Sequence, residues 1–180
     1  LYDFRPLISS DGWLPPVITE AQDVAHITPN QIRTSSKVWT IARLERFVSN
    51  PPGWRNWLLR GLATTATPGT EGLVTPENGT QREVWENALK KGWLEGRENA
   101  DLTLEANMKQ LTRDYNGMML FSLLWRQGMI SRPEVTEQQQ TVTGTHNKMI
   151  TGDRVRQLKT HAAFELQKSR WRPAVTAGGN

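Results

Sequence analysis

The most regular pattern of apolar positions lies in the middle of the chain. Apolar or small residues recur there every three or four positions, which is the spacing of one face of an α-helix. They are Trp85, Leu89, Trp93, Gly96, Ala100, Leu104, Met108, Leu111 and Tyr115. The pattern predicts a long amphipathic helix.

The predicted helix begins near residue 81, because Thr80 and Glu83 have the spacing of an N-terminal capping box. No proline interrupts the run that follows, so the backbone N–H groups are free to form helical hydrogen bonds. We expect the helix to reach about residue 115. There it either breaks at Asn116 and Gly117 or continues, through a stretch that is apolar nearly all round, to Gln127.

A shorter helix is predicted in the segment SNPPGWRNWL, residues 49–58. Proline is favourable in the first turn of a helix, where its missing N–H would have no partner. The apolar residues that follow recur at helical spacing and share one face: Trp54, Trp57, Leu58 and Leu62. We therefore expect a proline corner followed by a short amphipathic helix.

Strands are predicted on both sides of the helices. Residues 31–48 have the pattern of a hairpin that turns at Ser35 and Ser36, and residues 37–44 alternate at Trp39 and Ile41. Towards the C-terminus three short stretches alternate β-branched and polar residues, which is typical of an antiparallel meander. They are 134–143, 148–151 and 154–160, with turns at Gly144 and at Gly152-Asp153.

The remaining segments show no periodicity. Residues 1–30 contain four prolines and predict an irregular strap, and residues 63–76, rich in Thr, Gly and Pro, predict a flexible loop. Together these elements predict a single α+β domain over residues 1–180. In that fold an antiparallel sheet from the N- and C-terminal segments packs on the long central helix and the short helix.

The composition fits one folded domain with a polar surface. A chain of 180 residues can bury roughly two thirds of the surface that it exposes when unfolded. Hydrophobic residues make up 37% and the mean hydropathy is −0.58. No run of about 18 apolar residues occurs, so no transmembrane helix is predicted, and any export signal would lie outside this chain.

The charge distribution favours contact between protein subunits over contact with nucleic acid. The net charge is +4, but residues 31–60 and 148–172 are basic whereas residues 77–105 are acidic. Such an asymmetry suits pairing of basic and acidic surfaces between neighbouring copies or partners. The basic residues are not interleaved with aromatic residues as in known nucleic-acid-binding modules, so direct nucleic-acid binding is the less favoured alternative.

Sequence motifs for catalysis, metals and cofactors are missing. The three histidines (His26, His146 and His161) do not have the spacing of metal ligands, there is no cysteine, and glycine-rich phosphate loops and nucleophile elbows do not occur. We therefore predict no catalytic residues, no metal and no cofactor. The alternative of a periplasmic enzyme rests on Arg113, Asp114 and Tyr115, which are read more simply as a network at the end of a helix.

The eight tryptophans are spread over the whole chain, which is the distribution of core and interface anchors rather than of one stacking groove. In the 49–58 corner we expect Trp57 to serve as a structural foot and Trp54 to dock a partner, with Arg55 turned away toward the rim. The residues predicted to dock partners are Trp54, Arg55, Trp57, Trp93 and Trp171.

Short matches in a fixed order show that the sequence resembles the DotC family of type IVB secretion systems and IncI-type conjugation systems. The resemblance runs from about Leu14 to Val175. It is carried by Leu14-Pro15-Pro16-Val17, Arg46-Phe47-Val48, Pro51-Pro52, Trp54-Arg55, Trp85, Gly92-Trp93, Gly96, Arg113-Asp114-Tyr115, Gly117-Met118, Val142-Thr143-Gly144, Trp171 and Pro173-Ala174-Val175.

The resemblance implies a structural, non-catalytic subunit of the outer-membrane core complex, a lipoprotein family at the periplasmic face of the outer membrane. Its members are expected to form a homo-oligomeric ring with DotD-like and DotH-like subunits. It also implies attachment to the outer membrane through a lipid anchor, which would lie outside this chain.

Overall fold

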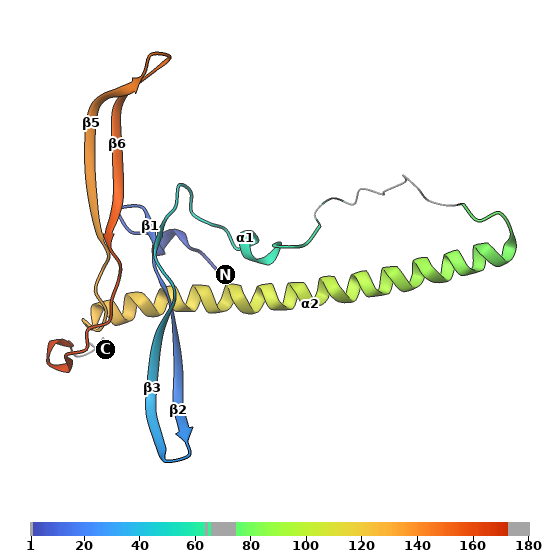
Figure 1. Ribbon diagram of the computed structural model, residues 1–180, viewed down its shortest axis with the longest axis horizontal. Coiled ribbons are helices and arrows are strands. Elements are labelled where there is room, and N and C mark those ends of the chain that lie inside the picture. Colours follow the sequence, from blue (N-terminus) through green and yellow to red (C-terminus); the bar gives the residue numbers. More distant parts are fainter. Residues whose placement is uncertain (1, 64, 66–74, 173–180) are drawn as a thin grey trace, which may run out of the picture. The chain divides into compact units, whose positions relative to one another are not determined.

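The computed structural model describes residues 2–63, 65 and 75–172 (Figure 1). Its described elements, in chain order, are η1 (Arg5–Leu7), β1 (Trp13–Leu14), β2 (Val17–Thr28), β3 (Gln31–Arg43), β4 (Arg46–Phe47), α1 (Arg55–Leu58), α2 (Gly79–Arg126), β5 (Glu134–Thr145), β6 (Lys148–Thr160) and η2 (Lys168–Arg170). The predicted α+β class is confirmed: antiparallel strands from the N- and C-terminal parts accompany one long and one short helix.

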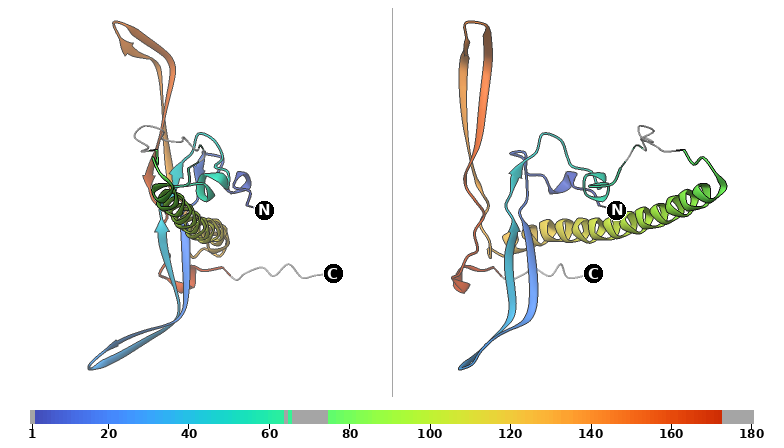
Figure 2. Two further views of the ribbon diagram at one scale, coloured as in Figure 1. Left: turned by 90° about the vertical axis from the view of Figure 1, so that its right-hand side faces the viewer. Right: turned by 45° about the vertical axis from the view of Figure 1, so that its right-hand side comes forward.

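The described residues form two compact units. One unit holds the described part of residues 1–2 and 53–112, and the other holds that of residues 3–52 and 113–180. Among the described residues the strands form three separate antiparallel pairs, β1–β4, β2–β3 and β5–β6, instead of one continuous sheet. Figure 2 shows β2–β3 and β5–β6 as two-stranded ribbons in both views.

The N-terminal hairpin is longer than predicted and turns at another place. Its strands β2 and β3 pair from Val17 to Thr28, so the turn falls at Pro29-Asn30, and the predicted turn at Ser35-Ser36 is wrong. Proline fixes the backbone angle that a turn requires, and asparagine adopts turn conformations readily, so Pro29-Asn30 is the stronger turn signal. Serine favours turns more weakly and is accommodated here within a strand. The prediction of an irregular strap is therefore wrong from Val17 onward. The predicted loop 63–76 lies largely outside the described residues.

The C-terminal segment forms one hairpin instead of the predicted meander. The strands β5 and β6 pair from Glu134 with Thr160 to Thr145 with Lys148, so the predicted turns at Gly144 and Gly152-Asp153 are wrong. The backbone at Gly144 has a φ of 154°, and a Cβ there would overlap the Lys148 carbonyl oxygen. Gly144 therefore allows the backbone of Lys148 to come close beside the turn, and it is not a residue of the turn itself.

Helix α2 starts at a different cap from the predicted one. The Asn78 side-chain oxygen accepts a hydrogen bond from the Gln81 N–H at 2.9 Å, and the Gln81 side-chain oxygen accepts one from the Glu77 N–H at 2.8 Å. This reciprocal arrangement is close to a capping box. Thr80 lies inside the helix, so the predicted cap at Thr80 and Glu83 is wrong by two positions.

The helix runs without a break through Asn116 and Gly117 and spans 48 residues in all. Gly117 is needed for packing: a Cβ there would lie 2.6 Å from both the Ile18 carbonyl oxygen and a Val17 methyl carbon. The glycine thus lets β2 pass directly over the helix backbone. At the C-terminal end Gly128 has a φ of 68°, and the Met129 N–H donates to the Leu124 carbonyl at 2.9 Å, as in a Schellman motif.

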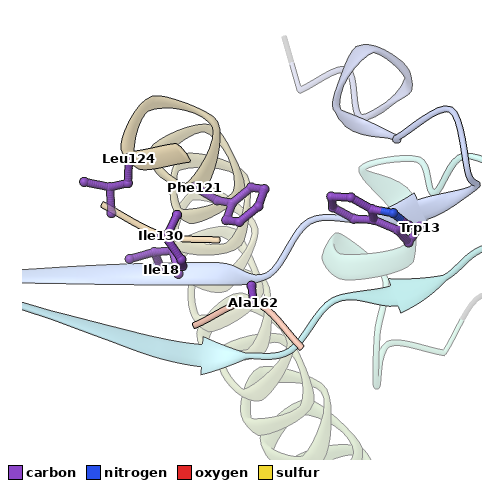
Figure 3. Packing of buried hydrophobic residues seen from close by; sticks show 6 residues of the cluster. All are labelled: Trp13, Ile18, Phe121, Leu124, Ile130 and Ala162. Carbon is purple, nitrogen blue, oxygen red and sulfur yellow. The ribbon is translucent and has the colours of Figure 1, made fainter. Parts of the chain in front are cut away.

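The core of the second unit forms where the base of β2 crosses the last turns of α2. Trp13, Ile18, Phe121, Leu124, Ile130 and Ala162 make one buried cluster. Figure 3 shows these side chains gathered beside α2. The rings of Trp13 and Phe121 meet edge to face, with 6.1 Å between the ring centres. Full burial of each large apolar side chain contributes about 1.5–3 kcal/mol.

Candidate assembly surfaces

Residues 53–58 of the corner are attached to α2 within the first unit. Trp57 is buried, with 3% of its surface exposed, and thus occupies the place expected of a structural foot. From α2, the Asn107 side-chain amide donates hydrogen bonds to the carbonyls of Leu58 and Arg60, at 3.0 and 2.8 Å. These bonds satisfy the carbonyl of the last residue of α1 and a carbonyl of the turn that follows it.

Asn107 was missed by the sequence analysis. It lies on the apolar face of α2, three residues after Leu104 and four before Leu111, where a polar residue is unusual. A buried polar side chain is almost always hydrogen-bonded. A polar residue in this apolar row was therefore the available signal that Asn107 binds backbone groups of another segment.

Trp54 and Arg55 form the outer part of the corner. Trp54 is half-buried, and the Arg55 guanidinium carbon lies 4.8 Å from the centre of its ring. Stacking of this kind contributes roughly 0.5–1 kcal/mol at an exposed site. Arg55 is exposed and stacks on Trp54, so the two side chains present one combined cationic and aromatic surface.

The N-terminal half of α2 exposes a row of large apolar side chains. Trp85, Leu89 and Trp93 are 39%, 50% and 75% exposed, and they follow one another at intervals of four residues. Together with Ala88 and Gly92, these residues line a shallow groove along the helix. We name Trp85, Ala88, Leu89, Gly92, Trp93, Gly96 and Ala100 the α2 face.

The glycines of the α2 face are not explained by contacts within the described residues. A Cβ added at Gly92 or Gly96 would meet nothing within 4 Å, unlike one at Gly117. Glycine inside a helix is less favourable than alanine by about 0.5–1 kcal/mol, so two such positions lower the stability of the free helix. Their presence favours close approach of another backbone to this face.

Trp171, the fifth predicted docking residue, lies in the second unit. Its indole N–H donates to the Glu165 carbonyl at 2.9 Å, and the ring is half-buried. Hydrogen bonding from the Gln167 N–H, and then from Arg170, lowers the pKa of the Glu165 carboxyl. The structure therefore brings Trp54, Arg55 and Trp57 together and places Trp93 on α2 and Trp171 in a separate C-terminal segment.

The Arg113, Asp114 and Tyr115 group lies inside α2 and not at its end, which corrects the sequence reading. Asp114 is fully buried, and its two oxygens meet the Arg43 guanidinium at 2.9 Å and the Arg113 guanidinium at 2.9 Å. Tyr115 instead meets the Phe4 ring edge to face, with 5.3 Å between the ring centres. The ion pair of Arg43 with Asp114 connects strand β3 to α2.

A second buried carboxylate was also missed. One oxygen of Glu45, whose side chain is fully buried, accepts a hydrogen bond from the Ala162 N–H at 3.1 Å and lies 2.8 Å from His161 Nδ1. This pairing joins the segment after β3 to the segment after β6. Only tertiary structure brings these residues together, because they are far apart in the sequence.

The hairpins expose apolar side chains at their tips. Ile27 and Ile32, paired across the end of β2–β3, are 69% and 68% exposed. Near the end of β5–β6, Val142 and Met149 are 62% and 76% exposed. Exposed apolar side chains on a two-stranded ribbon are typical of a surface that another chain covers.

No cluster of three or more metal-ligating side chains occurs within 2–63, 65 and 75–172. Over the same ranges, no helix combines the length and the apolar character that a membrane span requires.

The fold and its surfaces define an α+β protein whose long helix and hairpins present apolar side chains outward. The chain belongs to the T4SS_TraI family, described as type IV secretory system, conjugal DNA-protein transfer, whose model matches residues 1–173. It is thus a protein of a conjugative type IV secretion system. No curated protein matches the chain.

Proposed function

We propose that the chain is a DotC-like structural subunit of the outer-membrane core complex of a type IVB secretion or conjugative transfer system. In this proposal several copies form a ring at the periplasmic face of the outer membrane. Membership of the conjugal transfer family supports the type of machinery. The role within it is argued from the exposed elements.

The observation that carries the proposal is that the hairpins have almost no core of their own. In β2 only the first two residues are buried, and in β5 and β6 none is. A two-stranded hairpin is at best marginally stable in water, and its unpaired edges are ready to accept a further strand. Strands of 12 and 13 residues are therefore explained best if neighbouring subunits cover them.

We infer a non-catalytic role for the polar clusters. Asp114 is held by two arginines and Glu45 by a backbone N–H and a histidine, so each is engaged in joining elements of the fold. This use supports a structural protein over the alternative of a periplasmic enzyme.

The partners proposed are ring neighbours and DotD-like and DotH-like subunits, with the outer membrane reached through a lipid anchor outside this chain. The cationic and aromatic pair of Trp54 and Arg55 is the surface we assign to a partner subunit. Aromatic and arginine side chains are enriched at the energetic centres of interfaces. We propose no direct contact with nucleic acid.

A pair of alanine variants tests this assignment. Trp57→Ala should lower the melting temperature, because truncation of a buried tryptophan costs about 3–5 kcal/mol. Trp54→Ala should leave the melting temperature within a few degrees but abolish co-purification with core-complex subunits. If Trp54→Ala co-purifies as the unchanged protein does, the corner is not the docking surface.

A further inference from the structure

The α2 face continues a row that is buried elsewhere in the same unit. Asn107 and Leu111 are buried on α2, and Ala100 precedes Asn107 by two helical turns on the same side. From Ala100 the row runs back through Gly96 to Trp85, where every member is exposed. On this side of the helix, the described residues cover Asn107 and Leu111 but leave the stretch from Trp85 to Ala100 uncovered.

Large and small residues on the α2 face are arranged in complementary halves. The large side chains are Trp85, Leu89 and Trp93, and each is followed seven residues later by a small residue, namely Gly92, Gly96 and Ala100. We propose that, in the free subunit, the α2 face of a second copy packs antiparallel on this one, with the crossing point between Gly92 and Trp93.

Antiparallel pairing about this point matches each large residue with a small one. Trp85 meets Ala100 of the second copy, Leu89 meets Gly96, and Trp93 meets Gly92. The two helices approach closely because the glycines have no side chain, and the large side chains fill the space beside them. Parallel pairing in register would instead set tryptophan against tryptophan and glycine against glycine.

The charges beside the α2 face favour the same arrangement. In the antiparallel pair, Glu86 on one flank lies within two positions of Arg97 of the second copy. On the other flank, Lys91 lies within one position of Glu95 of the second copy. Lys91 and Glu95 pair with each other within one helix at 3.8 Å, but they remain 78% and 62% exposed, so a second chain can reach both. Opposite charges beside an apolar seam select partner and orientation.

This pairing goes beyond the proposed function and does not rest on it. A two-fold contact closes on two copies and cannot by itself build a ring, so ring contacts would use other surfaces. The inference concerns the purified subunit alone, and its failure would leave the ring proposal intact.

Single cysteines test the orientation cleanly, because the chain contains no cysteine. A side chain at Gly92 weakens the dimer, but a disulfide traps the fraction that pairs, so Gly92→Cys, next to the crossing point, should accumulate a linked dimer under mild oxidation, whereas Glu98→Cys on the opposite side should not. Ala88→Cys should link to Gly96→Cys when the two variants are mixed, and neither should link to itself. Self-linking of Ala88→Cys together with no mixed product would overturn the antiparallel arrangement.

Sedimentation equilibrium on the unlinked full chain tests the pairing itself. We expect a dimer at about 100 μM, and Trp93→Lys should raise its Kd at least tenfold. Leu94→Lys is the matched control, because Leu94 is also exposed, at 64%, but projects from another side of the helix. A monomer at this concentration, or equal weakening by both variants, would refute the proposal.

Alanine at the two glycines distinguishes an effect on the helix of the monomer from an effect on packing in the dimer. Combining Gly92→Ala with Gly96→Ala should raise the helix content of the monomer in circular dichroism, because alanine favours helix over glycine. The same variant should weaken the dimer at least tenfold, because the added methyl groups hold the helices apart. Dimerisation as tight as that of the unchanged chain would contradict close packing at the glycines.

Discussion

The substitution Gly117→Ala separates tertiary packing from helix propensity at one position of α2. Alanine favours a helix over glycine by about 0.5–1 kcal/mol, so propensity alone predicts stabilisation. In the structure, however, the new Cβ would lie 2.6 Å from the Ile18 carbonyl oxygen and from a Val17 methyl carbon. Both neighbours are the first residues of β2 and end a run of six consecutive buried residues, 13–18.

Relief of this overlap requires β2 to move away from the helix by several tenths of an ångström. Overpacking in a well-packed core costs about 1–3 kcal/mol. Because one of the overlapped atoms is a backbone oxygen, the upper part of this range, about 2–3 kcal/mol, applies. Subtracting a propensity gain of about 1 kcal/mol leaves a net destabilisation of Gly117→Ala of about 1–2 kcal/mol. For a chain of this size, a loss of that magnitude lowers the melting temperature by roughly 2–8 °C.

Thermal unfolding followed by circular dichroism measures this effect. Gly96→Ala, in a Trp93→Lys background that keeps the chain monomeric, is the control, because a Cβ at Gly96 meets nothing within 4 Å. The control should keep or raise its melting temperature relative to Trp93→Lys alone. If Gly117→Ala proves as stable as the unchanged protein, the close crossing of β2 over α2 is refuted.

Three further predictions concern single residues. Ala100→Pro should reduce the helical signal and kink α2, because proline inside a helix costs about 3 kcal/mol or more; an unchanged spectrum would contradict a continuous helix. Asp114→Ala should lower the free energy of unfolding by about 1.5–3 kcal/mol, because it removes the fully buried carboxylate that pairs with the partly exposed Arg43 and Arg113; a loss below about 1 kcal/mol would argue against a stabilising role of these ion pairs. Hydrogen bonds from Gln22 and then from the Trp39 indole lower the pKa of Glu20, so its contribution is present above the ordinary value of 4.5 and lost as the pH falls through the lowered pKa. The Trp39 indole N–H signal in NMR should shift in that acidic range and stay constant in Glu20→Gln; identical titrations would exclude the interaction.

The elements that follow a strong local rule were predictable from the sequence. The long helix was predicted because its apolar spacing persists over many turns and no proline interrupts it. Trp39 and Ile41, predicted to alternate in a strand, lie in β3 and pack against the core as partly buried residues. Trp57 was expected to be a structural foot and is buried.

Other features depend on contacts that no local rule contains. Gly117 resembles a helix breaker in the sequence, but in the structure it accommodates the backbone of β2. Ser35 resembles a turn residue, but it pairs with Val24 because the stronger turn signal lies earlier in the chain. Glu45 meets Ala162 only after the chain folds, so its burial could not be inferred from neighbouring residues.

The central claim is that this conjugal transfer protein is a structural subunit of a ring at the outer membrane. The most direct measurement is isolation of the tagged full-length protein from the outer-membrane fraction of donor cells, followed by low-resolution electron microscopy of the purified material. The account predicts a ring that contains several copies of the chain together with DotD-like and DotH-like subunits. Recovery of the chain alone, or in an inner-membrane assembly without a ring, would contradict it.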